Sequence, residues 1–299
     1  MKNHAVHRGS RVALACLLVV AAVAATSAPP RRARAADKMK PEEVVAKHLE
    51  AIGAPETRTS VSSRIVMGTV VADFRAPALG QVPGRAVLFS KGPMHAIGMV
   101  FEGVANYPQD KVGFDGEDVS TSFVLPGRRS TLGEFLMSNK SIIKQGLLGG
   151  ALSQAWPLLD LESKKPKLEY SGLKRVGDRP AHALKYLPRG GSDLNITLFF
   201  DAETFQHLRT EYTGSRAAQI GTSPDNSARQ QESRYRMYED FSDFRKEGGL
   251  TLPHGYELGL EITLPGGSYR MKWDFTLANF AYNQPIDLKS FDVDDTSGR

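Results

Sequence analysis

Residues 268–280 show the strictest two-residue alternation of the chain, and this pattern limits the fold more than any other feature. Apolar side chains at Tyr269, Met271, Trp273, Phe275 and Leu277 alternate with Arg270, Lys272, Asp274 and Thr276. This period predicts a β-strand with one buried face. Further strands are expected at residues 60–75, 86–90, 95–101, 168–176, 181–187, 194–200, 205–212, 232–245 and 252–264, and two short strands within 111–123 are expected to flank a turn at 114–117. Short turns such as 91–94 and 201–204 join neighbours, which favours an antiparallel meander whose long sheet must curl.

Two segments depart from this rhythm and predict helices. Residues 41–52 begin with Pro41, carry apolar residues at helical spacing and end before Gly53. Residues 131–160 form a helical insert, in which Ser130 or Thr131 can cap the first helix and Glu134 can complete the cap. Residues 149 and 150, both glycine, are expected to separate two helices of the insert. The fold class is therefore mainly β with helices on the concave face, and the polar stretch 214–231 is expected to be a flexible loop.

The N-terminus has the pattern of an export signal. Residues 1–35 combine basic residues, an apolar stretch at 12–25 and small residues at 33 and 35, which predicts cleavage before Ala36. The alternative is an uncleaved anchor, although the apolar stretch is shorter than the roughly 20 residues of a membrane-spanning helix. Cys16 lies inside the stretch rather than at its end, which argues against a lipid-modified cysteine. Residues 36–299 are then expected to form one domain without cysteine.

Charge and motifs argue against several function classes. The first 35 residues contain six of the 38 basic side chains, so the remainder carries 32 basic and 33 acidic side chains. This near-neutral remainder lacks the excess of positive charge that is typical of nucleic-acid-binding proteins. The hydrolase, phosphate-loop and dinucleotide motifs are missing from the sequence, so an enzyme is not expected. The five histidines beyond the leader lie too far apart for local metal-ligand spacing, and most are expected at the surface or half-buried. Neither a metal nor a cofactor is expected.

An acidic cluster, Glu239, Asp240 and Asp243, lies next to Arg245 and Lys246. Such a cluster could hold a cation or supply an acid and a base. The interpretation we favour is a strand end with local ion pairs.

Several segments, taken in order, resemble the LolA-like family of exported proteins, which includes the periplasmic carrier of outer-membrane lipoproteins. They are residues 86–94 (AVLFSKGPM), 113–116 (GFDG), 177–180 (GDRP), 198–201 (LFFD) with Thr204, 238–253 (YEDFSDFRKEGGLTLP) and 279–291 (NFAYNQPIDLKSF). Two features depart from the family pattern. Gly92 separates Lys91 from Pro93, and the aromatic residue after the Asp-Gly turn is missing.

The resemblance implies an antiparallel half-open β-barrel whose concave face is covered by helices and whose apolar lumen binds acyl chains. The implied function is a periplasmic, non-catalytic, monomeric carrier of a lipid or acylated protein, working with donor and acceptor proteins of the envelope. The alternative is an envelope regulatory or protein-interaction module of the same fold, in which residues 131–160 plug the lumen instead of acting as a lid. The sequence does not identify the cargo. Candidate lumen and lid residues are Phe135, Leu136, Ile143, Leu147, Trp156, Met99, Phe101, Leu198, Tyr269, Met271, Trp273 and Phe275.

Overall fold

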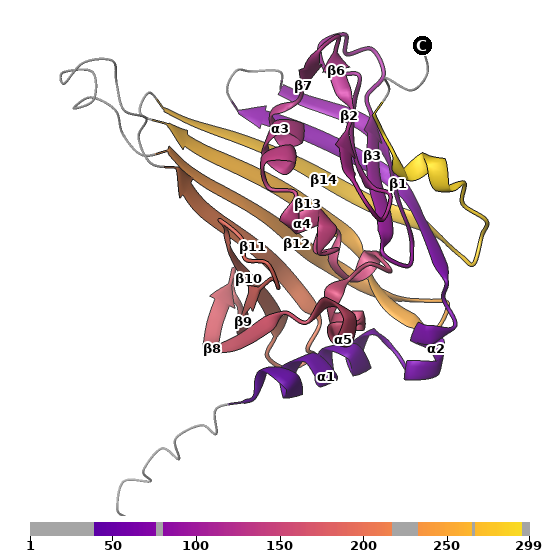
Figure 1. The fold of residues 1–299 in the computed structure, drawn as a ribbon, viewed down its shortest axis with the longest axis vertical. Helices are drawn as coiled ribbons and strands as arrows, with labels where there is room; N and C mark the ends of the chain where they lie inside the picture. Colours follow the sequence, from indigo (N-terminus) through magenta and orange to yellow (C-terminus); the bar gives the residue numbers. More distant parts are fainter. Residues whose placement is uncertain (1–38, 76–79, 217–232, 265–266, 295–299) are drawn as a thin grey trace, which may run out of the picture. The chain divides into compact units, whose positions relative to one another are not determined.

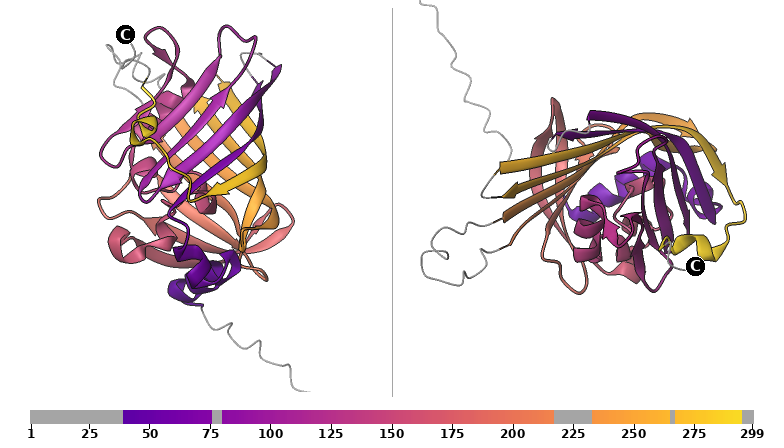
Figure 2. Two further views of the ribbon diagram at one scale, coloured as in Figure 1. Left: turned by 90° about the vertical axis from the view of Figure 1, so that its right-hand side faces the viewer. Right: turned by 90° about the horizontal axis from the view of Figure 1, so that it is seen from above.

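Twelve strands of the described residues form one antiparallel sheet that curves around a set of short helices (Figures 1 and 2). The computed structural model describes residues 39–75, 80–216, 233–264 and 267–294. The expected leader at 1–35 lies outside them, as does most of the expected loop at 214–231. The strands are β1 (Ser63–Arg75), β2 (Gly80–Lys91), β3 (Met94–Val100), β4 (Gln109–Phe114), β5 (Val119–Thr121), β8 (Lys167–Val176), β9 (Arg179–Leu187), β10 (Asn195–Asp201), β11 (His207–Arg216), β12 (Ser233–Glu247), β13 (Leu250–Leu264) and β14 (Gly267–Tyr282).

The sheet order is β5-β4-β3-β2-β1-β14-β13-β12-β11-β10-β9-β8. Each half is a meander, and the halves join where the first strand pairs with the last, for example Val70 opposite Phe275. The sheet has two edges, β5 and β8, so it remains an open half-barrel. A separate hairpin, β6 (Phe123–Leu125) and β7 (Arg128–Arg129), lies near the β5 edge. The predicted class, mainly β with an open antiparallel sheet and helices on its concave face, is therefore confirmed.

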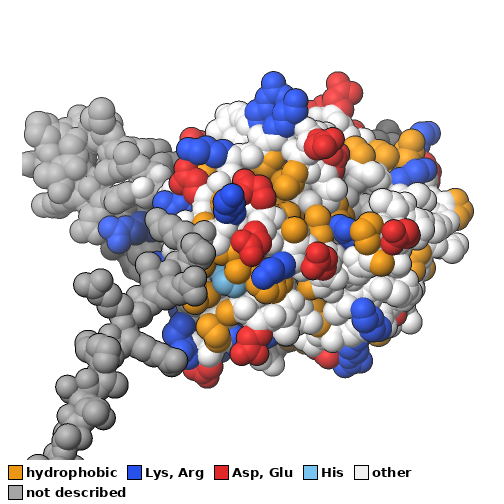
Figure 3. Space-filling view, turned by 90° about the horizontal axis from the view of Figure 1, so that it is seen from below, with side chains coloured by type: hydrophobic (Ala, Val, Ile, Leu, Met, Phe, Trp, Pro, Cys, Tyr) orange, Lys and Arg blue, Asp and Glu red, His pale blue; other side chains and the backbone are white. Residues whose placement is uncertain are grey.

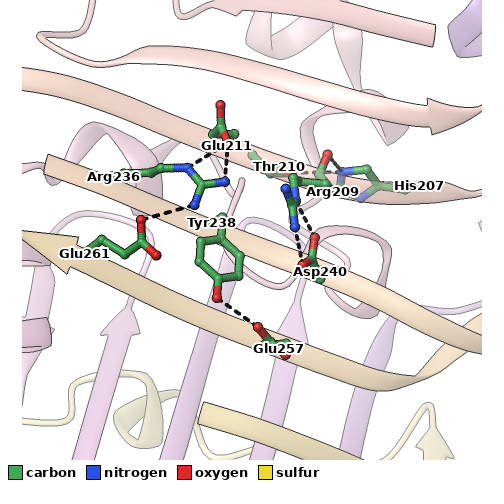
Figure 4. A network of polar contacts seen from close by, with 9 residues as sticks. All are labelled: His207, Arg209, Thr210, Glu211, Arg236, Tyr238, Asp240, Glu257 and Glu261. Atoms are coloured by element: carbon green, nitrogen blue, oxygen red, sulfur yellow. Dashed lines mark hydrogen bonds and ion pairs between the residues drawn. The ribbon is translucent and has the colours of Figure 1, made fainter. Parts of the chain in front are cut away.

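The alternation at residues 268–280 divides the two faces of β14 as expected. Met271, Trp273, Phe275 and Leu277 are buried on the concave face. The convex face of the central strands carries cross-strand ion pairs (Figure 4). Arg236 bridges Glu211 and Glu261, with nitrogen–oxygen distances of 2.7 and 3.3 Å. These half-exposed pairs keep the outer face polar and add little to stability individually.

Two helices of the described residues precede β1, and α1 (Pro41–Ile52) follows the predicted bounds. Pro41 occupies the first turn, and Val44, Val45, His48 and Ile52 are buried. The short α2 (Pro55–Thr59) leads into β1. Seen from below, basic and acidic side chains are intermixed over this end of the molecule (Figure 3). None of the described helices is long and apolar enough to cross a membrane.

The insert at 131–160 folds differently from the two helices expected. Its helical pieces are α3 (Thr131–Ser138), α4 (Ser141–Lys144) and the 3₁₀ turns η1 (Gly150–Leu152) and η2 (Pro157–Leu159), and α5 (Leu161–Lys164) follows directly after it. Ser130 caps α3 as predicted, because its hydroxyl accepts a hydrogen bond from the Gly133 amide at 2.8 Å. The prediction of a second long helix was wrong. Gly146, Gly149 and Gly150 all have positive φ, which interrupts an α-helix.

The C-terminal segment crosses the convex face of the β5 half. The turn η3 (Leu288–Phe291) buries Phe291 completely, 5.1 Å from the ring of Phe89. A Cβ at Gly113 would lie 2.1 Å from the Phe291 carbonyl oxygen, so only glycine permits this approach. The Val293 amide donates to Ser120 Oγ at 2.9 Å and fixes the end of the segment on β5.

Candidate functional site

The interior of the half-barrel is occupied by residues 142–156, which we call the plug. Ile142, Ile143, Leu147, Leu148 and Trp156 each expose no more than 1% of their surface. They pack against the concave face in one continuous hydrophobic core with strand residues such as Leu198 and Leu258. Burial of this extent contributes about 1.5–3 kcal/mol for each large apolar side chain. The plug is therefore an integral part of the core in this state.

Buried polar contacts also fasten the plug to the surrounding elements. The Gly149 amide donates to Glu239 Oε1 at 2.6 Å. Arg64 of β1 donates to the carbonyl oxygen of Ala151. The Gln154 amide donates to Ser90 Oγ of β2 at 2.9 Å. Each contact gives a hydrogen-bond partner to a backbone group of the plug. Burying such a group without a partner would cost about 1–3 kcal/mol.

Glu239 is the acidic group at the centre of these contacts. Its side chain is fully buried, and its carboxylate also accepts hydrogen bonds from Tyr212 at 2.7 Å and Tyr256 at 2.8 Å. Burial raises the pKa of Glu239 to about 7, although the three hydrogen bonds oppose the shift. The carboxylate thus joins the plug to β11, β12 and β13.

The structure corrects our interpretation of the acidic cluster at 239–243. Its members lie within β12 rather than at its end, and Glu239 is buried on the concave face. Asp240 lies on the opposite face and pairs with Arg209, whereas Asp243 pairs with Arg245 as expected. A strand places neighbouring residues on opposite faces, so the cluster in sequence is not a cluster in space.

The five described histidines are buried, exposing between 1% and 7% of their surface, which corrects the expected surface positions. His48 Nδ1 donates to the Phe205 carbonyl oxygen at 3.0 Å, so its Nε2 accepts the Trp156 indole hydrogen at 3.2 Å. Trp156 stacks on His207 with 4.7 Å between ring centres. Burial lowers the pKa of His48 to about 4, so the imidazole is neutral at physiological pH. Within the described residues, no group of His, Asp and Glu could hold a metal ion.

An open cleft of about 880 Å³ lies between the β6–β7 hairpin, the start of α3 and the concave face of β1, β13 and β14. Its walls are mainly apolar and include Phe74, Leu132, Ile262, Met271 and Trp273. Arg128 and Arg129 of β7 lie at its border, and no Asp or Glu is among the lining residues. The volume is within the range of about 300–1,000 Å³ that is typical of ligand sites.

A buried polar chain supports the wall of this cleft. The Trp273 indole donates to the Tyr107 hydroxyl at 3.0 Å, and that hydroxyl donates to Asp110 Oδ2 at 2.8 Å. The Ser130 side chain also hydrogen-bonds the Asp110 carboxylate. Burial raises the pKa of Asp110 to about 6, and these hydrogen bonds limit the shift. This series of hydrogen bonds fixes the Trp273 indole and the Tyr107 phenol ring that face the cleft.

The residues predicted for the lumen separate into two groups. Tyr269, Met271 and Trp273 line the cleft. Phe135, Leu136, Ile143, Leu147, Trp156, Met99, Phe101, Leu198 and Phe275 are buried in the core away from it. Sequence reasoning missed Phe74, Tyr107 and both arginines, because these residues meet at the cleft only through tertiary packing of distant segments.

A second hollow of about 500 Å³ lies on the convex face beside the C-terminal segment. Its lining includes Met67, Val87, Val100 and Val293, with Arg85 and Asp292. None of the plug residues is among those that line it.

Comparison with known proteins gives similarity of fold. No family model and no curated protein matches the chain. A solved LolA superfamily protein, NE2245 from Nitrosomonas europaea, is 13% identical over 85% of this chain and 97% of its own, with a TM-score of 0.45. A DUF1329 family protein from Desulfovibrio piger is 11% identical over 85% and 98%, with a TM-score of 0.45. A proposed outer membrane lipoprotein-sorting domain from Vibrio parahaemolyticus is 11% identical over 84% and 97%, with a TM-score of 0.43.

The curved open sheet with helices on its concave face agrees with the half-open barrel that the sequence resemblance implied.

Proposed function

We propose that this protein is a non-catalytic binding protein of the periplasm that holds the apolar part of a lipid or a lipidated protein in the cleft. The observation that carries the proposal is the cleft itself, a preformed apolar site of about 880 Å³ on the concave side of the half-barrel. Each methylene group buried there contributes about 0.8 kcal/mol before the cost of ordering the chain. Affinity would come from burial, and no covalent step is needed. The periplasmic location rests on the expected leader.

The plug determines how such a cargo could bind. Because the deep interior is filled, the cleft accepts a chain without rearrangement, whereas entry into the full lumen would require the plug to leave. Leaving would expose Leu147 and Trp156 and break the hydrogen bonds to Glu239, Arg64 and Ser90. We therefore place the acyl chain in the cleft rather than beneath the plug.

The fastened plug also favours a second candidate function. A lumen filled by fully buried side chains suits an envelope protein-interaction module, in which the half-barrel is a rigid scaffold and carries no cargo. The two candidates differ in whether an apolar ligand binds.

The first test is native mass spectrometry of the protein purified gently from an envelope fraction. A co-purifying mass that disappears after organic extraction and fits an acyl lipid would support the carrier. An apo mass, with no uptake of an added palmitoylated peptide, would favour the interaction module.

A variant links binding to this cleft. Tyr269 lines the cleft and exposes 40% of its surface, so Tyr269→Asp should weaken binding of a palmitoylated fluorescent peptide without unfolding the protein. Leu173→Asp, at an apolar residue of β8 that is 60% exposed, is the matched control. Equal affinities of both variants and wild type in fluorescence anisotropy would contradict the assignment of the cleft.

A further inference from the structure

The two arginines of β7 place positive charge at the border of a cleft whose walls are otherwise mainly apolar. We propose that the cleft selects lipids whose head group carries a net negative phosphate, with the head at Arg128 and the tail on Trp273 and Met271. The inference rests on the proposed function, since it specifies which amphiphile the same site binds.

Arg129 is held in place by its neighbours. Its Nε donates to Thr121 Oγ1 at 2.8 Å, and its guanidinium lies 4.3 Å from the centre of the Phe123 ring. Its Nη2 lies 3.8 Å from an oxygen of Asp294, and both side chains are half-buried. Asp294 therefore offsets part of the Arg129 charge, and Arg129 serves mainly to fix the hairpin.

Arg128 is the residue that remains available to a ligand. Its side chain is exposed, it borders the cleft, and it forms no ion pair within the described part of the chain. A guanidinium binds a phosphate through two parallel hydrogen bonds, which makes it better suited to this group than an ammonium. The neighbouring Thr131 is exposed and adds a neutral hydroxyl donor at the same border.

The charge distribution also sets the direction in which an amphiphile would lie. Asp110 exposes 2% of its surface and lies behind Tyr107 and Ser130, on the inner side of the cleft wall. Its carboxylate would repel an anion placed deep in the cleft, whereas the cations of β7 attract one at the border. The tail therefore points inward to the apolar floor and the phosphate outward to Arg128.

The test compares two probes with the same palmitoyl chain, lysophosphatidylglycerol, which is anionic, and lysophosphatidylcholine, which has no net charge. Binding to the full protein is measured by titration calorimetry below the micellar concentration. Wild type should bind the anionic lipid about tenfold more tightly, because the phosphate of the other lipid is offset by its own choline. Arg128→Gln should remove this preference by weakening the anionic lipid much more than the zwitterionic one. The matched control is Arg175→Gln on β8, whose exposed pair with Asp178 lies on the opposite half of the sheet.

The other outcomes separate the two proposals. Equal binding of both lipids to wild type, or an equal loss of both in Arg128→Gln, overturns the head-group inference and leaves the carrier function. Binding of neither lipid overturns the proposed function together with the inference. Inorganic phosphate at matched ionic strength should not displace the anionic lipid. Displacement would identify a site for free phosphate and overturn the inference for a lipid.

Discussion

Glu239→Gln is the substitution that tests most directly how the plug is held. The replacement keeps the shape of the side chain but cannot ionise. It retains an oxygen that can accept from the Gly149 amide, and its amide group can donate to the Tyr212 hydroxyl. The variant therefore removes the titration of the site while preserving most of its contacts.

The direction of the pH effect follows from the pKa. Burial raises the pKa of Glu239 from 4.5 to about 7 in the folded protein. The folded state then binds more protons than the unfolded state between these values, so stability from this group is full below pH 4.5 and is lost as pH rises through 7. The difference between the two pKa values corresponds to about 3 kcal/mol of unfolding free energy, because each pKa unit equals about 1.4 kcal/mol. Relative to wild type, Glu239→Gln should therefore gain about 3 kcal/mol between pH 4.5 and pH 8.

The assay is urea unfolding at a series of pH values, followed by the fluorescence of Trp156 and Trp273, which are both buried. Other titrating groups cancel in the difference between variant and wild type, because they are present in both proteins. Glu162→Gln, at an exposed residue of α5, controls for the loss of a charge. A stability difference that stays constant over the whole pH range would refute the reasoning, since Glu239 would then titrate as it does in the unfolded chain.

Three further predictions concern stability and can be checked by thermal or urea unfolding. Ser130→Ala should cost about 2 kcal/mol, because it removes both the cap of α3 and a hydrogen bond to Asp110, and Ser130→Thr should restore much of the loss. Gly146→Ala should cost at least about 3 kcal/mol, because φ is 77° and the new Cβ would lie 1.9 Å from the Ala155 carbonyl oxygen. Gly127→Ala, with φ of 71° and open space around the Cβ, should cost only about 1–2 kcal/mol. Burial lowers the pKa of His95 to about 4, so its contribution is full above pH 6.5 and is lost as pH falls towards 4. His95→Gln should therefore lose less stability than wild type between pH 7 and pH 5, and an unchanged pH profile would contradict this.

The strands could be predicted well because their information is local. Alternation at residues 268–280 fixed both the existence of β14 and the face that it buries. The turn at Asp201 was predicted from its residue types, and its carboxylate indeed accepts from the amides of Glu203 and Thr204. Helix α1 was predicted from Pro41, its apolar spacing and Gly53. In each case, the residues that determine the structure are close neighbours in sequence.

The features of the interior and the cleft could not be predicted in this way. The position of Glu239 depends on the strand face that it occupies and on a partner amide 90 residues away. The Tyr107–Trp273 contact joins groups separated by 166 residues. The same holds for the cleft, whose walls come from segments on both sides of the insert. A single sequence contains no signal for such pairs, because neither spacing nor composition shows which distant segments meet.

The pairing of β1 with β14 has a consequence for how the chain reaches its native state. The two meanders can form early from local hairpins. The pairing of β1 with β14, which joins them, closes a very long loop and raises the contact order. Until β14 is available, the edge of β1 that faces away from β2 is unpaired. The pairing of β1 with β2 over residues 63–74 covers only the other edge. A chain interrupted before residue 267 would keep this edge exposed and would be prone to edge-to-edge aggregation. Completion of the sheet therefore depends on β14, the last of the described strands to be synthesised.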